Sequence, residues 1–184
     1  MLLAIAGVTG VGKSYFKDKI VEKLNFEKIK IITTRQIRTG EKNNEDKIFV
    51  TPTELNEMKK SNLISYDFEM LGNIYAYSKK ELYSNKNTVF ELHYKTVFDL
   101  KKICPNMKVL YILPKNIEIA KEKTILRHLS PEVEKQRLQE IDEHYNNFIN
   151  DENLRNQFDY IVYNNYDKES EDNIIKLVKN ILNN

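Results

Sequence analysis

Short apolar segments alternate with longer segments of helical periodicity along most of the chain. The apolar segments are residues 2–6, 29–32, 88–92, 109–113 and 160–163. The helical patterns are residues 13–24, 94–103, 117–129, 131–149 and 170–182. A short, continuous apolar run is typical of a strand that is covered on both faces, as in a parallel sheet. The alternation therefore predicts an α/β fold, with a five-stranded parallel core sheet flanked by helices and joined by right-handed crossovers.

One stretch, from residue 33 to residue 83, breaks this alternation. It contains β-like pieces at residues 48–50, 63–70 and 73–77, and a helical pattern at residues 53–60. Short strands of mixed apolar and polar residues are typical of a sheet with one exposed face. We expect an inserted lobe of mixed α/β structure here.

The bulk composition narrows the class of protein. The 184 residues suit one folding unit, and 29 basic residues against 27 acidic ones give no reason to expect nucleic acid or a membrane surface as partner. No apolar run approaches the roughly 20 residues that span a bilayer. The single Cys104 and the uncharged, apolar start of the chain favour a reducing, cytoplasmic setting. We expect a monomer or a homodimer.

A glycine-rich loop follows the first apolar segment and precedes the first helical pattern. It reads Gly7, Val8, Thr9, Gly10, Val11, Gly12, Lys13 and Ser14, and it holds three of the five glycines in the chain. Glycines let the backbone curl around a phosphate with its N–H groups pointing inward, and the positive end of the following helix adds to the attraction. A lysine at position 13 reaches the β- and γ-phosphates of a nucleotide, while the Ser14 hydroxyl can bind Mg²⁺. The loop predicts a site for ATP and Mg²⁺.

A second basic segment follows the second apolar run and reads Thr-Thr-Arg-Gln-Ile-Arg-Thr-Gly-Glu over residues 33–41. Taken alone, it is a polar loop that solvent would cover. Together with the glycine loop it resembles the guanylate kinase family, whose members carry Thr-Thr-Arg-x-x-Arg-x-Gly-Glu at this place. Three further matches extend the resemblance over nearly the whole chain. They are the turn at residues 71–75, the arginines at positions 127 and 137, and the strand at residues 158–164.

The resemblance implies a role for each of these matches. Arg35, Arg38 and Tyr75 would grip the phosphate of an acceptor nucleotide, and Asn164 would lie near the adenine of ATP. Lys13, Arg127 and Arg137 would be catalytic, the two arginines belonging to a lid that closes over the γ-phosphate. The implied division of the single domain is a core of residues 1–33, 84–115 and 150–184, an acceptor-binding lobe of residues 34–83, and a lid of residues 116–149. Small-molecule nucleotides would be the only partners.

Several positions depart from the pattern of the family. Ile31 and Lys47 stand where a Ser and a Tyr are expected. The acidic residue that reads the acceptor base is replaced by Tyr66, although a small shift in alignment offers Asp67 or Glu69 instead.

The end of the third apolar segment departs as well, since Glu91-Leu92-His93 replaces Asp-x-Asp. Glu91 can still serve substrate or Mg²⁺, whereas His93 is mostly neutral at pH 7. His128 and His144 lie in helical patterns without metal-ligand spacing, and we interpret them as surface or boundary residues.

Three hypotheses follow. The first is a kinase that converts ATP and GMP to ADP and GDP. The second is a kinase with the same grip on phosphate but a different acceptor, and the third is an interaction module of the same fold that has lost catalysis. The intact Gly12-Lys13-Ser14 speaks against the third, because a binding module has no need of a phosphate loop.

Overall fold

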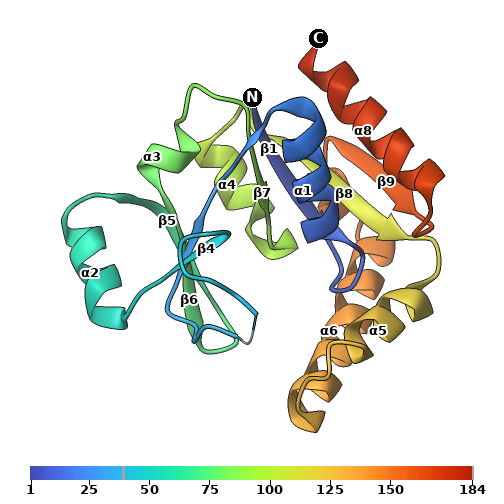
Figure 1. The fold of residues 1–184 in the computed structure, drawn as a ribbon, viewed down its shortest axis with the longest axis horizontal. Helices are drawn as coiled ribbons and strands as arrows, with labels where there is room; N and C mark the ends of the chain where they lie inside the picture. Colours follow the sequence, from blue (N-terminus) through green and yellow to red (C-terminus); the bar gives the residue numbers. More distant parts are fainter. Residues whose placement is uncertain (39, 184) are drawn as a thin grey trace.

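A five-stranded parallel sheet forms the centre of the protein (Figure 1). The structure, a computed structural model, describes residues 1–38 and 40–183. The strands run in the order β2 (Glu27–Lys28), β7 (Thr88–Glu91), β1 (Leu2–Gly7), β8 (Lys108–Pro114) and β9 (Tyr160–Asn164). Every neighbouring pair in this sheet is parallel. The predicted α/β class and the five-stranded parallel core are confirmed.

Helices cover both faces of this sheet, and alternate residues of β1 pack on opposite sides, as the pleat requires. Leu3 and Ile5 belong to the apolar cluster under α1 (Lys13–Leu24) and α8 (Lys168–Leu182). Ala4 and Ala6 belong to the cluster on the other face. The helices of that second face are α4 (Val97–Ile103), which follows the short 3₁₀ helix η1 (Tyr94–Thr96), part of α6 (Pro131–Asn150), and α7 (Glu152–Arg155). No helix among residues 1–38 and 40–183 is long and apolar enough to cross a membrane.

A second sheet, mixed in direction, forms a lobe beside the core. Its order is β4 (Lys47–Phe49), β3 (Ile31–Thr33), β6 (Asn73–Ser78) and β5 (Ile64–Met70). Two helices complete this mixed lobe, α2 (Pro52–Lys60) and α3 (Lys79–Leu82). Ile32, Leu55 and Ala76 form its own small apolar cluster. The inserted lobe predicted from the broken pattern is therefore present.

The prediction that residues 29–32 form a strand of the core sheet is wrong. The strand beside β7 is Glu27–Lys28, and Ile31–Thr33 pairs with β4 and β6 in the second sheet. The chain changes sheets inside one apolar run, since Ile29 is buried in the core cluster and Ile32 in the cluster of the lobe. An apolar run reports burial and not which sheet buries it.

A pair of helices extends below the core sheet in Figure 1, to the right of the mixed lobe. These helices are α5 (Ile117–Ile125) and α6, joined by residues 126–130. The predicted helix over residues 117–129 ends at Ile125, and His128 takes a left-handed conformation with φ of 51°. The helix predicted at residues 131–149 is confirmed to within one residue.

Gly10 of the glycine loop lies directly against α5. A Cβ atom built at Gly10 would be 2.1 Å from the carbonyl oxygen of Ala120, and its φ is +82°. Gly72, in the turn between β5 and β6, has a φ of +68°, yet a Cβ there would meet nothing within 4 Å. The two glycines share a left-handed backbone and differ only in their surroundings.

We predict that Gly10→Ala lowers the free energy of unfolding by about 3 kcal/mol, whereas Gly72→Ala lowers it by only about 1 kcal/mol. The left-handed strain is common to both variants, and the collision with α5 is specific to the first. Urea denaturation of both variants checks this. Equal losses would show that α5 does not pack on the loop as described.

Candidate active site

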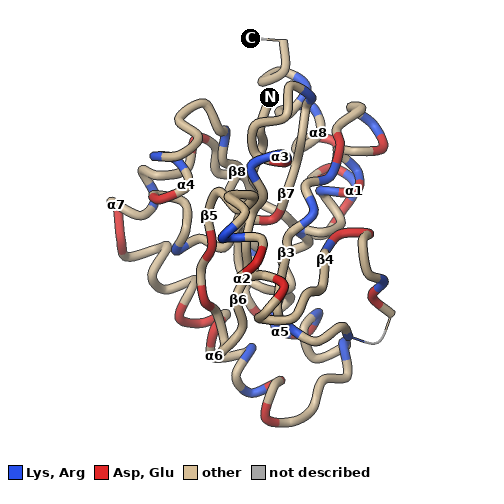
Figure 2. The backbone as a smooth tube through the Cα atoms, turned by 90° about the vertical axis from the view of Figure 1, so that its left-hand side faces the viewer, with Lys and Arg blue, Asp and Glu red and all other residues tan. Residues whose placement is uncertain are grey.

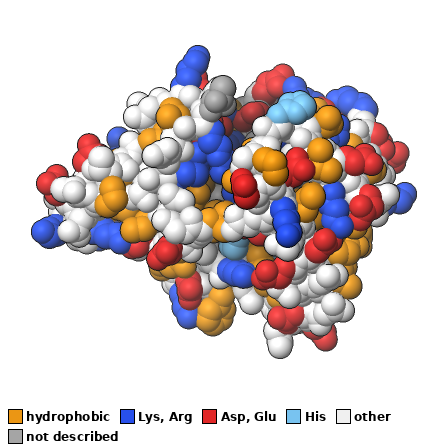
Figure 3. Space-filling model, turned by 90° about the horizontal axis from the view of Figure 1, so that it is seen from below, with side chains coloured by type: hydrophobic (Ala, Val, Ile, Leu, Met, Phe, Trp, Pro, Cys, Tyr) orange, Lys and Arg blue, Asp and Glu red, His pale blue; other side chains and the backbone are white. Residues whose placement is uncertain are grey.

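An open cleft of about 2090 Å³ lies between the carboxyl ends of the core strands, the mixed lobe and the α5–α6 pair. Figure 3 shows the hollow, with Lys and Arg side chains gathered in its middle. The predicted site residues that line the cleft are Gly7, Thr9, Gly10, Gly12, Lys13, Ser14, Arg38, Glu69, Tyr75, Glu91, Arg127, Arg137 and Asn164. Segments far apart in sequence thus meet where ligands bind in open α/β sheets, at the carboxyl ends of the strands.

The glycine loop presents main-chain donors at the start of α1. The N-terminus of α1 has no side-chain cap and no acidic residue in its first turn, and the capping residue, Gly12, has a left-handed φ of 94°. The first N–H groups of a helix have no partner within the helix, so an uncapped end attracts an anion. Val8 and Val11, also predicted in this site, are fully buried and serve it only through their backbone.

Lys13 bends back over the loop. Its ammonium group donates to the carbonyl oxygens of Gly7 and Val8, at 2.8 Å each. Burial is the main cause that lowers the pKa of Lys13 from 10.5 to about 8; the charge of Glu91 opposes this shift, and the positive charges of Arg127 and Arg137 add to it. Lys13, Arg127 and Arg137 therefore act on one another across the cleft, and their catalytic roles stay a prediction.

Glu91, at the carboxyl end of β7, is held by cations from α1. Its Oε1 lies 3.1 Å from the ammonium group of Lys17. Burial raises the pKa of Glu91, but the charges of Lys17 and Lys13 and a hydrogen bond from Ser14 outweigh burial and lower the pKa overall. Glu91 is thus an ionised carboxylate next to the Ser14 hydroxyl, and two hard oxygen ligands of this kind suit Mg²⁺.

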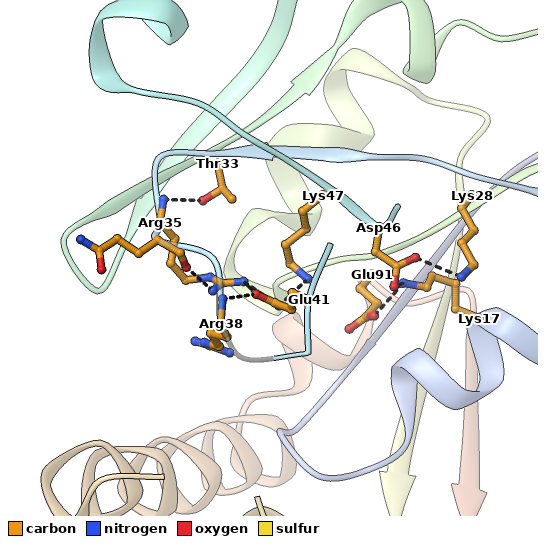
Figure 4. Close-up of polar contacts among 10 residues, drawn as sticks. Lys17, Lys28, Thr33, Arg35, Arg38, Glu41, Asp46, Lys47 and Glu91 are labelled. Atoms are coloured by element: carbon orange, nitrogen blue, oxygen red, sulfur yellow. Dashed lines mark hydrogen bonds and ion pairs between the residues drawn. The ribbon is translucent and has the colours of Figure 1, made fainter. Parts of the chain in front are cut away.

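The two arginines of the second basic segment have different surroundings (Figure 4). Arg38 lines the cleft, and burial together with the charges of Arg35 and Arg137 lowers its pKa. Arg35 is only 8% exposed and does not line the cleft. Its guanidinium group donates to both carboxylate oxygens of Glu41, at 2.8 and 2.9 Å, and that carboxylate also accepts from the backbone N–H of Arg38. Arg35 supports the loop, and Arg38 faces the cleft. Thr39 of this segment lies outside the described residues.

An aromatic wall forms the side of the cleft that belongs to the mixed lobe. Phe68 stacks on Tyr75 and Tyr77 with ring centroids 5.5 and 6.3 Å apart, and Tyr66 stacks on Phe68. Of the two acidic alternatives to Tyr66, Glu69 lines the cleft, whereas Asp67 forms an ion pair with Lys59 at 2.5 Å and does not line it. This wall offers flat apolar faces to a planar ring.

The interpretation of His144 as a surface or boundary residue is wrong. It is 8% exposed, stacks on Tyr94 with ring centroids 3.6 Å apart, and lies 3.0 Å from the Tyr111 hydroxyl. Burial lowers the pKa of His144 to about 2 and that of His93 to about 4. Both rings line the cleft as neutral groups. The part of the chain that the structure describes contains no cluster of three or more His, Cys, Asp or Glu residues suited to a metal ion.

Asn164 ties the last core strand to the glycine loop. Its side-chain amide donates to the carbonyl oxygen of Val11 at 2.9 Å and accepts from the backbone N–H of Tyr166 at 2.7 Å. The Tyr166 hydroxyl donates to the carbonyl oxygen of Gly10 at 3.3 Å. Asn164 therefore shapes the loop from behind, and its proximity to adenine stays a prediction.

The lowered pKa of Lys13 predicts that nucleotide affinity depends on pH. A phosphate chain favours the ammonium form, which is lost as the pH rises through about 8. We expect the dissociation constant of ATP to rise about tenfold between pH 7 and pH 9. Calorimetry across this range checks it. Lys13→Arg, whose charge persists at pH 9, should show a flat profile, and a flat profile in the unchanged protein would contradict the prediction.

The lowered pKa of His144 predicts a loss of stability in acid. Below the ordinary pKa of 6.5 the unfolded chain binds a proton that the folded chain rejects, so stability falls as the pH drops. Between pH 6.5 and pH 5 we expect the protein to lose about 2 kcal/mol more than His144→Asn does. Urea denaturation at both pH values measures this, with His128→Asn as the control at an exposed histidine. If His144→Asn and the control show the same acid slope, the assignment is incorrect.

Comparison with known proteins agrees with this arrangement. The family model described as "Guanylate kinase" matches residues 1–184. The guanylate kinase of Lactococcus lactis is 26% identical and the alignment covers 97% of this chain and 87% of the relative. The guanylate kinase of Lactobacillus johnsonii is 30% identical over 69% of this chain and 65% of its own length.

Solved structures share the fold. A guanylate kinase from Anaplasma phagocytophilum superposes with a TM-score of 0.69 at 21% identity, covering 100% of this chain and 84% of its own. A shikimate kinase from Bacteroides thetaiotaomicron superposes less well, with a TM-score of 0.54 at 13% identity, over 100% of this chain and 99% of its own. The family match over the whole chain, joined to the cleft that unites the glycine loop with Arg38, shows that this protein belongs to the guanylate kinase family, a family of phosphotransferases.

Proposed function

We propose that this protein transfers the γ-phosphate of ATP to GMP, giving ADP and GDP. One observation supports this above the others: a single cleft holds Lys13 on the donor side and Arg38 on the acceptor side, with Arg137 acting electrostatically on both. Phosphoryl transfer asks little covalent chemistry of a protein and depends on holding two phosphates in line with their charge balanced.

In this proposal the donor phosphates lie on the glycine loop. The N–H groups at the start of α1 bind the phosphate oxygens, and Lys13 exchanges its two loop carbonyls for the β- and γ-phosphates. Ser14 and Glu91 would hold Mg²⁺, which when bound neutralises charge on the phosphate oxygens. Ser14 lies close enough to Glu91 to lower the pKa of that carboxyl, which supports the assignment.

The acceptor phosphate would bind at Arg38 and Tyr75. A guanidinium fork matches phosphate oxygens in pairs, and the Tyr75 hydroxyl adds a neutral donor. Arg35, bound to Glu41, would hold the loop that carries Arg38 and reach the phosphate only by leaving that carboxylate.

The α5–α6 pair would act as the lid of residues 116–149, with residues 34–83 as the acceptor lobe and the remaining residues as the core. Residues 126–130 between the helices supply a break about which the pair can swing. Closure would carry Arg127 and Arg137 toward the transferring phosphate, where they balance its charge, and would exclude water.

A second candidate keeps the reaction and changes the acceptor base. Two observations favour it: Asp67 is bound to Lys59 away from the cleft, and His93 is neutral where the family has a carboxylate. The aromatic wall then binds the base by stacking, with Glu69 as the nearby acidic group.

We place the protein in the cytoplasm, as a monomer or a homodimer. The buried, free Cys104 is compatible with a reducing setting.

We predict that GMP and ATP together yield ADP in a coupled assay, and that Lys13→Ala lowers kcat at least about a hundredfold, because it removes the cation at the transferring phosphate. Lys19→Ala is the matched control on the same helix, since Lys19 forms an exposed pair with Glu22. A Lys13→Ala variant with normal turnover would refute the kinase proposal.

A panel of nucleoside monophosphates in the same assay separates the two candidates. Under the first, GMP has the highest kcat/KM; under the second, another monophosphate exceeds it. Absence of ATP binding by calorimetry would instead support a non-catalytic module.

A further inference from the structure

Lys17 is a buried lysine on the phosphate-loop helix that the proposed chemistry leaves unused. It lies one helical turn beyond Lys13 and is 5% exposed. A lysine is rarely buried unless its charge is paired. Its ammonium group lies between two carboxylates, 3.1 Å from Glu91 Oε1 and 3.2 Å from Asp46 Oδ2 (Figure 4).

These two carboxylates belong to different parts of the molecule. Glu91 ends β7 of the core sheet beside the phosphate loop, whereas Asp46 immediately precedes β4 of the mixed lobe. The second oxygen of Asp46 lies 3.0 Å from Lys28 of the core strand β2, and Lys28 also pairs with Asp18 at 2.8 Å. Core lysines therefore hold Asp46 on both of its oxygens.

The segment that begins with Arg35 and Arg38, the arginines proposed to bind the acceptor, ends at Asp46. Glu41 binds Arg35 and the backbone of Arg38, and Lys47, next to Asp46, lies 3.7 Å from the Glu41 carboxylate. Two groups of contacts thus lie side by side: Glu91, Lys17 and Asp46 form one, and Lys47, Glu41 and the backbone of Arg38 form the other (Figure 4). The peptide bond between Asp46 and Lys47 joins them. Within the first group, Lys17 is the residue that joins the donor side to the acceptor side.

We propose that Lys17 is a positioning residue: by binding Glu91 and Asp46 at once, it fixes the acceptor segment, residues 35–38 and 40–46, at a set distance from the phosphate loop. The inference rests on the proposed kinase function. Because transfer requires two phosphates in line, a small displacement of Arg38 relative to Lys13 weakens the reaction even though Lys17 touches neither nucleotide.

Lys17→Met and Asp46→Asn test this. Methionine keeps an unbranched, flexible side chain without the charge, and asparagine keeps the shape of the carboxylate. We expect each variant to raise KM for GMP about tenfold while KM for ATP changes by less than about twofold, since the donor loop stays in place. The double variant should lose clearly less than the sum of the two single variants, because both remove the contact between Lys17 and Asp46. Lys19→Met, on the exposed side of α1, is the control and should leave both constants unchanged.

A lysine that only stabilises the fold gives a different result. Lys17→Met would then lower thermal stability and change both KM values alike, Asp46→Asn would leave KM for GMP unchanged, and the two effects would add. That outcome overturns the proposal. If Lys17→Met does not fold, Asp46→Asn alone decides, because Asp46 is partly exposed, with a side chain 37% accessible.

Hydrogen exchange without nucleotide separates this proposal from the kinase assignment. The backbone N–H of Ile31 donates to the Asp46 carbonyl at 3.2 Å, and that of Asn44 donates to the Lys47 carbonyl at 2.8 Å. Both amides should exchange about tenfold faster in Lys17→Met and in Asp46→Asn than in the unchanged protein. Their exchange rates should be unaffected in Lys19→Met. A protein without GMP turnover that still shows this pattern refutes the assignment of GMP as acceptor and keeps the positioning role. Unchanged exchange in both variants refutes the positioning role.

Discussion

Mutual repulsion among cations in one cleft is the constraint on which this site depends. Lys13, Arg38, Arg127 and Arg137 come from four segments and line the same hollow. Burial is the main cause that lowers the pKa of Lys13 and of Arg38, and repulsion by the neighbouring arginines, Arg137 in both cases, lowers each pKa further. Two nucleotides carry many negative charges to one point, and a pre-arranged set of cations is what lets their phosphates approach.

Carboxylates bind cations in and next to this set. Glu41 binds Arg35, Glu91 binds Lys17, and Glu140 lies 2.7 Å from Arg137. Acidic residues elsewhere in the chain nearly balance the basic ones, so the net charge of the whole chain is only +2. Figure 2 shows both signs interleaved along the backbone. A balanced surface around a basic cleft concentrates attraction for phosphates where they are needed.

The sequence predicts most reliably what is local along the chain. The glycine loop, Lys13 and Ser14 could be predicted because strand, loop and helix are contiguous, and their chemistry is set within a few residues. The pairing of Arg35 with Glu41 could not be predicted, because it depends on how the two side chains meet in the folded loop. Arg35 and Arg38 belong to the same sequence motif, yet only Arg38 lines the cleft.

Burial of polar groups accounts for the other differences. Lysine and histidine are usually solvated, so nothing in the composition around Lys17 or His144 marks either as buried. The available signal for Lys17 was its spacing of one turn from Lys13, which places both on one side of α1. The switch of the chain between sheets at residues 29–32 likewise depends on tertiary packing, because an isoleucine can be buried equally well in the core cluster or in the cluster of the lobe.

The central claim is that donor and acceptor phosphates meet between Lys13 and Arg38. A bisubstrate analogue, with adenosine and guanosine joined through a chain of phosphates, tests it directly by calorimetry. This analogue should bind at least about a hundredfold more tightly than ATP or GMP alone, because one molecule fills both halves of the cleft. An affinity no greater than that of ATP would contradict it.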